Sequence, residues 1–163
     1  MFDINRRSYI KTFLIVSTIP QPGYNKGYME KFEDFLKSRD TLRVYCGDTP
    51  VFSSSKERLL PLVECIKNIR IDRPAILFDR VTGNAASLLA VKLGCNELYS
   101  PLGSQLAIKT LLKYGITFHF LKIVTYIQNE TKQEMCPMEK LSINKGPEEF
   151  YNVICSRLNN QWD

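Results

Sequence analysis

Histidine is almost missing from this chain, which has one in 163 residues, and tryptophan is equally scarce. Catalytic zinc needs three protein ligands, most often histidine or cysteine, so a chain with a single histidine has few ways to build such a site. A C-x-x-C pair is lacking too, because the five cysteines are at least nineteen positions apart. An odd number of widely spaced cysteines indicates reduced thiols rather than a disulfide framework.

Long apolar runs are also lacking, and no stretch approaches the ~20 apolar residues of a membrane-spanning helix. The net charge is only +5, and no basic run has the length of a nucleic-acid-binding tail. We therefore expect neither a membrane span nor a nucleic-acid partner. With 44% hydrophobic and 24% charged residues, the chain has the composition of an ordinary globular domain.

The first residues of the chain allow two interpretations of its cellular location. Asn5-Arg6-Arg7-Ser8 is similar to a twin-arginine export motif, and Phe13–Ile19 is a short apolar run behind it. That run is at the lower limit for a signal peptide, and no small-residue cleavage site follows it. A cytoplasmic protein with an N-terminal extension, as an edge strand or a loose arm, is the favoured interpretation, with export as the alternative.

Apolar periodicity predicts one α/β domain over residues 28–163 after an extension over residues 1–27. A helix over 28–38 precedes a hairpin of strands near 41–46 and 51–52, and Ser55 is placed to cap a further helix. Buried strands at 74–78, 97–100 and 116–124 then alternate with helices that end at Gly94 and Gly115, and two proline-started helices follow. Alternating strands and helices indicate parallel pairing, so we predict a three-layer mixed sheet with helices on both faces.

Two segments carry a resemblance. Asp79-Arg80-Val81-Thr82-Gly83-Asn84-Ala85-Ala86 is similar to the Asp-Arg/Lys-Val-Val-Gly-Lys-Ala-Ala stretch of a small prokaryotic family of domains of unknown function (DUF1893), and Met135-Cys136-Pro137-Met138-Glu139-Lys140 resembles its second signature. The resemblance extends over about residues 28–159 and implies a cytidine-deaminase-like fold with no established activity. Asn84 departs from the family pattern, which usually has lysine there.

Zinc deaminase chemistry is not expected on this scaffold. It needs a His or Cys and a Glu at one helix start, and a Pro-Cys-x-x-Cys pair at the next. The corresponding helix starts, residues 79–84 and 100–104, contain no Cys, His or Glu, and His119 lies in a strand. No metal or other cofactor is therefore predicted.

The first candidate site is the corner from Asp79 to Asn84, which joins the carboxyl end of a strand to a helix. Open α/β sheets place ligands at such corners, and free amides at a helix start favour an anion such as phosphate. Thr82 and Asn84 could add hydrogen bonds, and Gly83 permits close approach of a ligand. The alternative is structural, with Asp79 as a helix cap and Gly83 in tight packing. Ser104 is placed to cap the next helix, and Gly103-Ser104 offers a second anion site at that helix start.

The second candidate is Cys136, which precedes Pro137 at a helix start, a setting that favours thiolate. Lys140, one turn further on, would reinforce this effect, whereas Glu139 would oppose it. Glu139 also stands three residues after Cys136, the position from which a capping box is closed. A structural helix start, with Met138 packed inward, is the alternative to a nucleophile.

These patterns favour a non-catalytic domain that either binds a small molecule or has a regulatory role. The more specific hypothesis is that the small molecule is a nucleotide. The ligand-binding residues of this hypothesis are Asp79, Thr82, Gly83, Asn84, Gly103, Ser104, Cys136, Glu139 and Lys140. A thiol enzyme or redox-responsive protein using Cys136 is one alternative, and a protein-interaction domain is another.

Overall fold

A five-stranded mixed sheet organises residues 26–159, the part of the chain that the computed structural model describes. Its order is β2-β1-β3-β4-β5. The pairs β1–β2 and β1–β3 are antiparallel, whereas β3–β4 and β4–β5 are parallel. The hairpin and the parallel half of the sheet are therefore both as predicted. The strands are β1 Leu42–Cys46, β2 Thr49–Ser54, β3 Ala75–Asp79, β4 Cys95–Ser104 and β5 Thr117–Val124.

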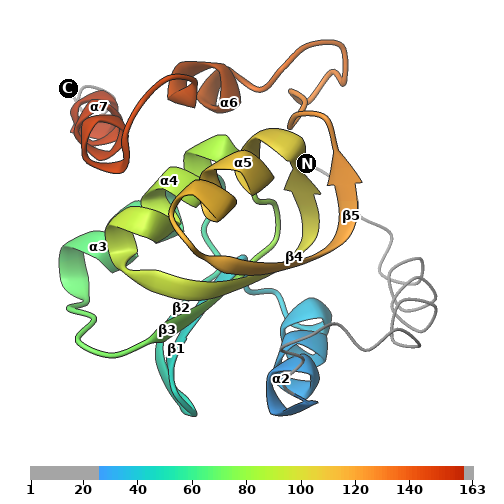
Figure 1. The fold of residues 1–163 in the computed structure, drawn as a ribbon, viewed down its shortest axis with the longest axis vertical. Coiled ribbons are helices and arrows are strands. Elements are labelled where there is room, and N and C mark those ends of the chain that lie inside the picture. Colours follow the sequence, from blue (N-terminus) through green and yellow to red (C-terminus); the bar gives the residue numbers. More distant parts are fainter. Residues whose placement is uncertain (1–25, 160–163) are drawn as a thin grey trace.

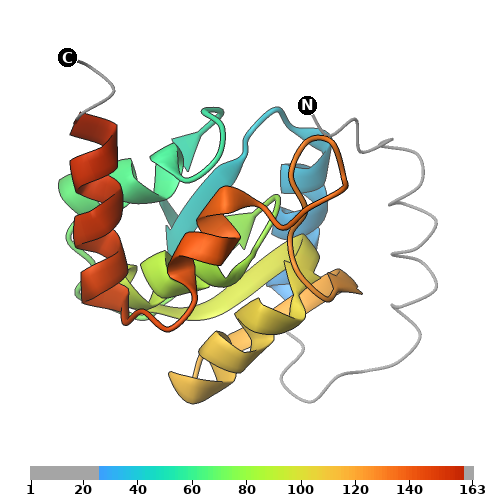
Figure 2. The same ribbon diagram turned by 90° about the horizontal axis from the view of Figure 1, so that it is seen from above.

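Helices cover both faces of this sheet, as predicted, but unequally (Figure 1). One face carries α2 and the other carries α3, α4 and α5, while α6 and α7 pack on the outer side of α4 (Figure 2). The prediction of three layers was therefore incomplete, because α6 and α7 add a partial fourth. The described helices are α2 Lys26–Lys37, α3 Leu60–Asn68, α4 Asn84–Leu93, α5 Gln105–Lys113, α6 Pro137–Ser142 and α7 Pro147–Asn159.

The extra layer follows from the sequence of α4, which buries eight of its ten residues. A helix that is apolar or small on nearly every side needs cover on two sides. The sheet, α3 and α5 provide one side, and Phe150 and Ile154 of α7 enter the same core on the other. The α2 face has its own core of aromatic side chains, in which Phe32, Phe78 and Tyr99 have ring centroids 5.4–5.6 Å apart. None of the helices within residues 26–159 is long and apolar enough to cross a membrane.

Two local predictions were wrong. Ser55 does not cap α3, which begins at Leu60 after Leu59 and without a side-chain cap. The strand predicted at 97–100 continues as β4 to Ser104, because Thr82 forms a parallel bridge with Gly103 and thereby extends the sheet. The turn-like sequence Ser100-Pro101-Leu102-Gly103 concealed this extension, and β4 rather than β5 is the longest strand. The predictions for residues 1–25 lie outside the described residues.

Arg80, directly after β3, ties the sheet to α2. Its guanidinium donates hydrogen bonds of 2.7–3.2 Å to four carbonyl oxygens: those of Phe35 and Leu36 in the last turn of that helix, and those of Ser38 and Asp40 just after it. The last carbonyls of a helix lack intrahelical donors, so a cation with a planar set of N–H groups stabilises this end. The same guanidinium lies 4.5 Å from the centre of the Phe35 ring.

We predict that Arg80→Ala lowers the free energy of unfolding by about 2 kcal/mol, since four carbonyls lose a charged donor. Arg80→Lys should recover only part of this loss, because an ammonium cannot reproduce the planar fork. Urea denaturation measures both, with Arg39→Ala, an exposed arginine two residues after α2, as the control. Equal effects of Arg80→Ala and Arg39→Ala would refute the capping role.

Candidate functional site

The starts of α4 and α5 lie side by side at the carboxyl ends of β3 and β4. Parallel neighbours place their carboxyl ends at the same edge of the sheet, so the segments that follow them meet there. The bridge between Thr82 and Gly103 holds the two segments together, with Thr82 N donating to Leu102 O at 2.8 Å. Gly83–Asn84 and Gly103–Ser104 are therefore brought into one place, as the sequence hypothesis requires.

Glu139 of α6 occupies the space between these two helix starts. Its side chain is buried, with 2% of the residue exposed. Oε2 accepts a hydrogen bond from the amide of Asn84 at 2.6 Å, and Oε1 accepts one from the hydroxyl of Ser104 at 2.7 Å. The amide of Ile127 also donates to Oε1, at 3.3 Å. The acceptor at the start of α4 is therefore a carboxyl side chain of the protein itself.

The Asn84 side chain connects α4 to α5 and α6 by hydrogen bonds. Its side-chain amide donates to the carbonyl and hydroxyl oxygens of Ser142 at 3.1 and 2.8 Å. Its carbonyl oxygen accepts a hydrogen bond from the hydroxyl of Thr110 in α5. The short polar side chain at this position thus links α4 to α5 and α6 inside the protein.

Position 83 requires glycine, because Glu139 leaves no room there for a side chain. A Cβ at Gly83 would lie 2.3 Å from Glu139 Oε2 and 2.8 Å from Ile127 Cγ1. A Cβ at Gly103 would meet the Phe120 ring at 2.1 Å. Both glycines therefore serve close packing, and the backbone of Gly103 faces an aromatic ring. Neither glycine has a positive φ angle.

Ser104 is the N-cap of α5, as predicted. Its hydroxyl oxygen accepts a hydrogen bond from the amide of Ala107 at 3.0 Å, while the hydroxyl donates to Glu139. One hydroxyl therefore uses both its acceptor and its donor capacity.

Asp79 does not cap α4, contrary to the structural alternative considered for it. The N-cap is Gly83, which has no side chain, and the first amide of the helix, that of Asn84, donates to Glu139 instead. Asp79 instead accepts a hydrogen bond from the Thr82 hydroxyl at 3.0 Å and is 8% exposed. Burial raises the pKa of Asp79 to about 7, although hydrogen bonds from Thr82 and from the amides of Val81 and Arg80 favour the ionised form.

Cys136 is the N-cap of α6 and is half-buried, and its side chain makes no capping bond. Its amide donates to Ile127 O at 2.8 Å. Glu139 points toward α4 and does not return to Cys136, so the capping-box interpretation was wrong. Lys140 is exposed and is not brought to the side chains around Glu139. Met138 packs against the main core, as predicted.

His119 is far from these groups in the fold. Its Nε2 lies 2.8 Å from Glu97 Oε1, and its ring stacks on Tyr99 with centroids 4.3 Å apart. Tyr99 belongs to the aromatic core beneath α2, whereas α6 packs on α4 beyond the opposite face of the sheet. The sheet therefore separates His119 from Cys136.

The donor set at the helix starts does not fit a zinc ion. It consists of one backbone amide, the Ser104 hydroxyl and the carboxylate of Glu139, and it includes no imidazole or thiol. Within residues 26–159, no three His, Cys, Asp or Glu side chains are grouped so that they could hold a metal ion. Every buried side-chain nitrogen and oxygen in that range has a hydrogen-bond partner.

Ser142, Thr110 and Ile127 belong to this network although no sequence pattern pointed to them. Ser142 and Thr110 are polar residues in or beside amphipathic helices, where a hydroxyl ordinarily faces solvent. Ile127 contributes only its backbone amide and a packing contact, and a sequence does not reveal either.

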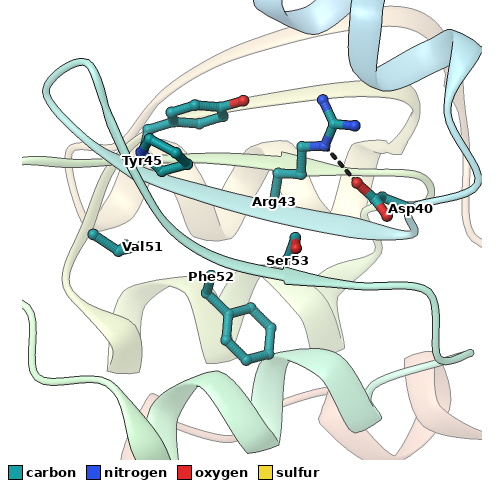
Figure 3. A pocket seen from close by; sticks show the side chains of 7 residues that line it. Asp40, Arg43, Tyr45, Val51, Phe52 and Ser53 are labelled. Atoms are coloured by element: carbon teal, nitrogen blue, oxygen red, sulfur yellow. Dashed lines mark hydrogen bonds and ion pairs between the residues drawn. The ribbon is translucent and has the colours of Figure 1, made fainter.

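A surface hollow of about 460 Å³ lies elsewhere, on the β1–β2 hairpin (Figure 3). Arg43 lines it beside Tyr45 and Ser53. Asp40 and Asp34 already pair with Arg43, at 2.5 and 2.8 Å, so its charge is compensated within the protein. A second hollow of about 650 Å³ separates α3 from the end of α7. Neither hollow coincides with the helix starts that hold Glu139.

Comparison with known proteins places the chain among domains of unknown function. The family model described as a domain of unknown function (DUF1893) matches residues 31–158. A crystal structure of a DUF1893 family protein from Thermotoga maritima is similar, with 25% sequence identity and a TM-score of 0.75. The match covers 82% of this chain and 92% of that one. None of the curated proteins matches this chain.

We predict that Gly83→Ala destabilises the fold by at least about 2 kcal/mol, because the added methyl displaces a buried carboxylate. Gly146→Ala is the matched control, since nothing lies within 4 Å of a Cβ built there. Its effect should stay within about 0.5 kcal/mol. Chemical denaturation of the two variants compares them, and similar stabilities would contradict the close approach of Glu139.

Asp79 should make stability depend on pH. Its folded-state pKa is raised from 3.8 to about 7, so the folded protein retains a proton that the unfolded chain releases. Below about pH 4 both states are protonated, and stability should fall as the pH rises from about 4 to 7. Asp79→Asn should lack this decline, and its advantage over wild type should grow to the order of a few kcal/mol.

Denaturation series between pH 4 and 8 measure this difference. Asp72→Asn is the control, because the Asp72 side chain is 81% exposed. A constant difference between Asp79→Asn and wild type across the range would disprove the raised pKa.

Proposed function

The chain belongs to the DUF1893 family, and from this premise we propose that it is a non-catalytic binding or regulatory domain for a small anionic ligand. The ligand binds where α4 and α5 begin, on a scaffold of the cytidine-deaminase type whose zinc ligands are replaced. In the narrower form of the proposal the anion is the phosphate of a nucleotide.

The observation that carries the proposal is the buried carboxylate of Glu139. A charge that is 2% exposed is stable only if donors compensate the loss of water, and here Asn84 N, Ser104 Oγ and Ile127 N do so. The same donors would serve an oxygen of a phosphate or carboxylate ligand, because the amide at a helix start and a hydroxyl bind anions of either kind. In the structure, the Glu139 carboxylate occupies the position that the anionic group of the ligand would take.

Binding of an external anion requires that α6 withdraw Glu139. This helix has only six residues and follows a largely exposed loop over 128–134. The Asn84 bonds to Ser142 would break with the same movement. A ligand that competes with an internal carboxylate changes the position of α6, so binding would be coupled to a surface change, as a regulatory domain requires.

A catalytic function receives less support from the side chains at this place. The hydroxyl that donates to a carboxylate here is that of Ser104, on Glu139. Both side chains are buried, and the Ser104 oxygen also accepts the Ala107 amide as the helix cap, so this pair is placed as a structural contact rather than as an accessible nucleophile. The thiol enzyme remains an alternative, but Cys136 has no imidazole beside it, because His119, the single histidine of the sequence, lies across the sheet. A protein-interaction domain is the other alternative, and the exposed apolar residues Leu112 and Ile123 are its support.

The test is anion rescue of Glu139→Ala. We expect this variant to lose about 3 kcal/mol or more, since the donors around the missing carboxylate remain buried without a partner. Acetate or inorganic phosphate should then restore at least about 1 kcal/mol at roughly ten times its dissociation constant. Thermal and chemical denaturation with increasing anion concentration measure the gain.

Two matched variants separate rescue from a general salt effect. Glu139→Gln fills the same space without the charge, and Glu134→Ala removes an exposed carboxylate from the adjoining loop. Salts that act by exclusion from the surface stabilise all variants equally. If Glu139→Ala gains no more than these two, the anion site is refuted. A nucleotide panel on the wild type then tests the narrower form through shifts in melting temperature.

A further inference from the structure

The outer side of β5 is an unpaired edge of the described sheet. β5 is a terminal strand, and within residues 26–159 no other strand pairs with its outer side. It has eight residues, contains no proline, and pairs with β4 without a register shift. Such a regular edge presents a row of amides and carbonyls that can pair with a further strand.

The opposite edge of the sheet is interrupted. β2 has six residues, its pairing with β1 is irregular between Val44 and Tyr45, and Pro50 removes one backbone donor. β5 has neither feature. Of the two edges, that of β5 is therefore the one to which a further strand can be added.

Apolar side chains are exposed along β5 and the helix that precedes it. Leu112 is 67% exposed, Tyr114 40% and Ile123 52%. Within residues 26–159, Ile143 is the one other large hydrophobic residue that is exposed. α5 and β5 pack on each other at the end of the sheet (Figure 1). The exposed apolar side chains are thus concentrated on the last helix–strand unit of the sheet.

The same unit is basic and has no acidic residue of its own. Between Glu97 and Glu130 the sequence contains no aspartate or glutamate, but it contains three lysines, Lys109, Lys113 and Lys122. All three are exposed, and none forms an ion pair with a carboxylate within residues 26–159. A partner with carboxylates is therefore favoured, because it compensates charges that the described part of the protein leaves uncompensated.

We propose that the β5 edge binds an extended acidic segment of another protein as an added strand. Addition of a strand to a sheet edge gives affinity through backbone hydrogen bonds and specificity through side chains on alternate faces. Leu121 and Ile123 lie on one face of β5 and Lys122 lies on the other, since side chains alternate along a strand. The strand that fits this edge alternates apolar side chains with carboxylates.

Other occupants fit this edge less well. A second copy of the chain would bring three further lysines to the same place, and like charges that face each other destabilise a strand pair. A lipid surface or a nucleic acid would attract the lysines. Neither provides the regular backbone donors and acceptors that the edge of a strand needs. An acidic peptide strand satisfies the backbone groups and the charges together.

Binding of a synthetic peptide to the full-length protein tests the proposal. The probe alternates valine and glutamate over eight residues, the length of β5, and has blocked ends and a fluorophore. We expect a dissociation constant below about 1 mM. The outward-facing amides within residues 117–124 should exchange at least about tenfold more slowly with the peptide bound, because they become paired. Amides of β3 should be unchanged.

Two control peptides separate strand addition from charge attraction. Lysine in place of glutamate keeps the backbone and reverses the charge, whereas proline in place of alternate valines keeps the charge and removes ladder donors. Both should bind at least about tenfold more weakly. On the protein, Lys122→Glu should weaken binding of the valine–glutamate peptide to the same extent. Lys67→Glu, the same change at an exposed lysine of α3, should not.

The proposal fails if the valine–glutamate peptide does not bind at about 1 mM, or if the proline-containing peptide binds as tightly. Equal effects of Lys122→Glu and Lys67→Glu count against it too. Outward-facing β5 amides that exchange as slowly without the peptide mean that the edge is already covered, by a second copy if light scattering detects a dimer and otherwise by this chain. Binding to phosphatidylglycerol vesicles that the peptide does not displace means a lipid surface. Either outcome rules out the acidic strand.

Discussion

The carboxylate of Glu139, buried between the starts of α4 and α5, is the interaction on which this part of the structure depends. A charge that is removed from water must be compensated by donors in fixed positions. Here the positions are set by two backbone segments, after β3 and after β4, and by the loop that contains Ile127. The requirement therefore fixes the spacing of α4 and α5 and holds α6 against them. Gly83 follows from the same constraint, because any larger residue would occupy the space of the carboxylate.

The two segments that resemble the DUF1893 family are two sides of one contact. Gly83 and Asn84 belong to the first, and Glu139 to the second, and they meet directly although fifty-five positions separate Asn84 from Glu139. Other residues of the first segment have separate tasks. Arg80 caps α2 on the far side of the sheet, and Asp79 bonds to Thr82 within the turn. A short motif therefore combines contacts to three different elements, which explains why it is recognisable without being a catalytic fingerprint.

The contact between Glu139 and Asn84 also shows that a helix start can be occupied by a side chain of the protein rather than by a ligand. An amide at the start of a helix attracts an anion from any source, and the nearest source is the chain itself. A protein that fills the place with its own glutamate can use the contact for stability alone, or can exchange the glutamate for a ligand. The difference lies in the free energy that is needed to withdraw α6, a short helix attached by exposed loops.

The sequence by itself determined the elements and their order. Apolar periodicity located α2, β1, β3, α4 and β5, and glycine or proline placed the ends of α4, α6 and α7, because these signals depend on residues close along the chain. The site was half predictable for the same reason: the corner after β3 and the Ser104 cap are local features. Only the tertiary structure decided where Glu139 points, that Asn84 reaches Ser142 and Thr110, and that β4 continues to Ser104. Each of these is a contact between distant segments, and side-chain direction across such a distance is set by packing, which no local pattern records.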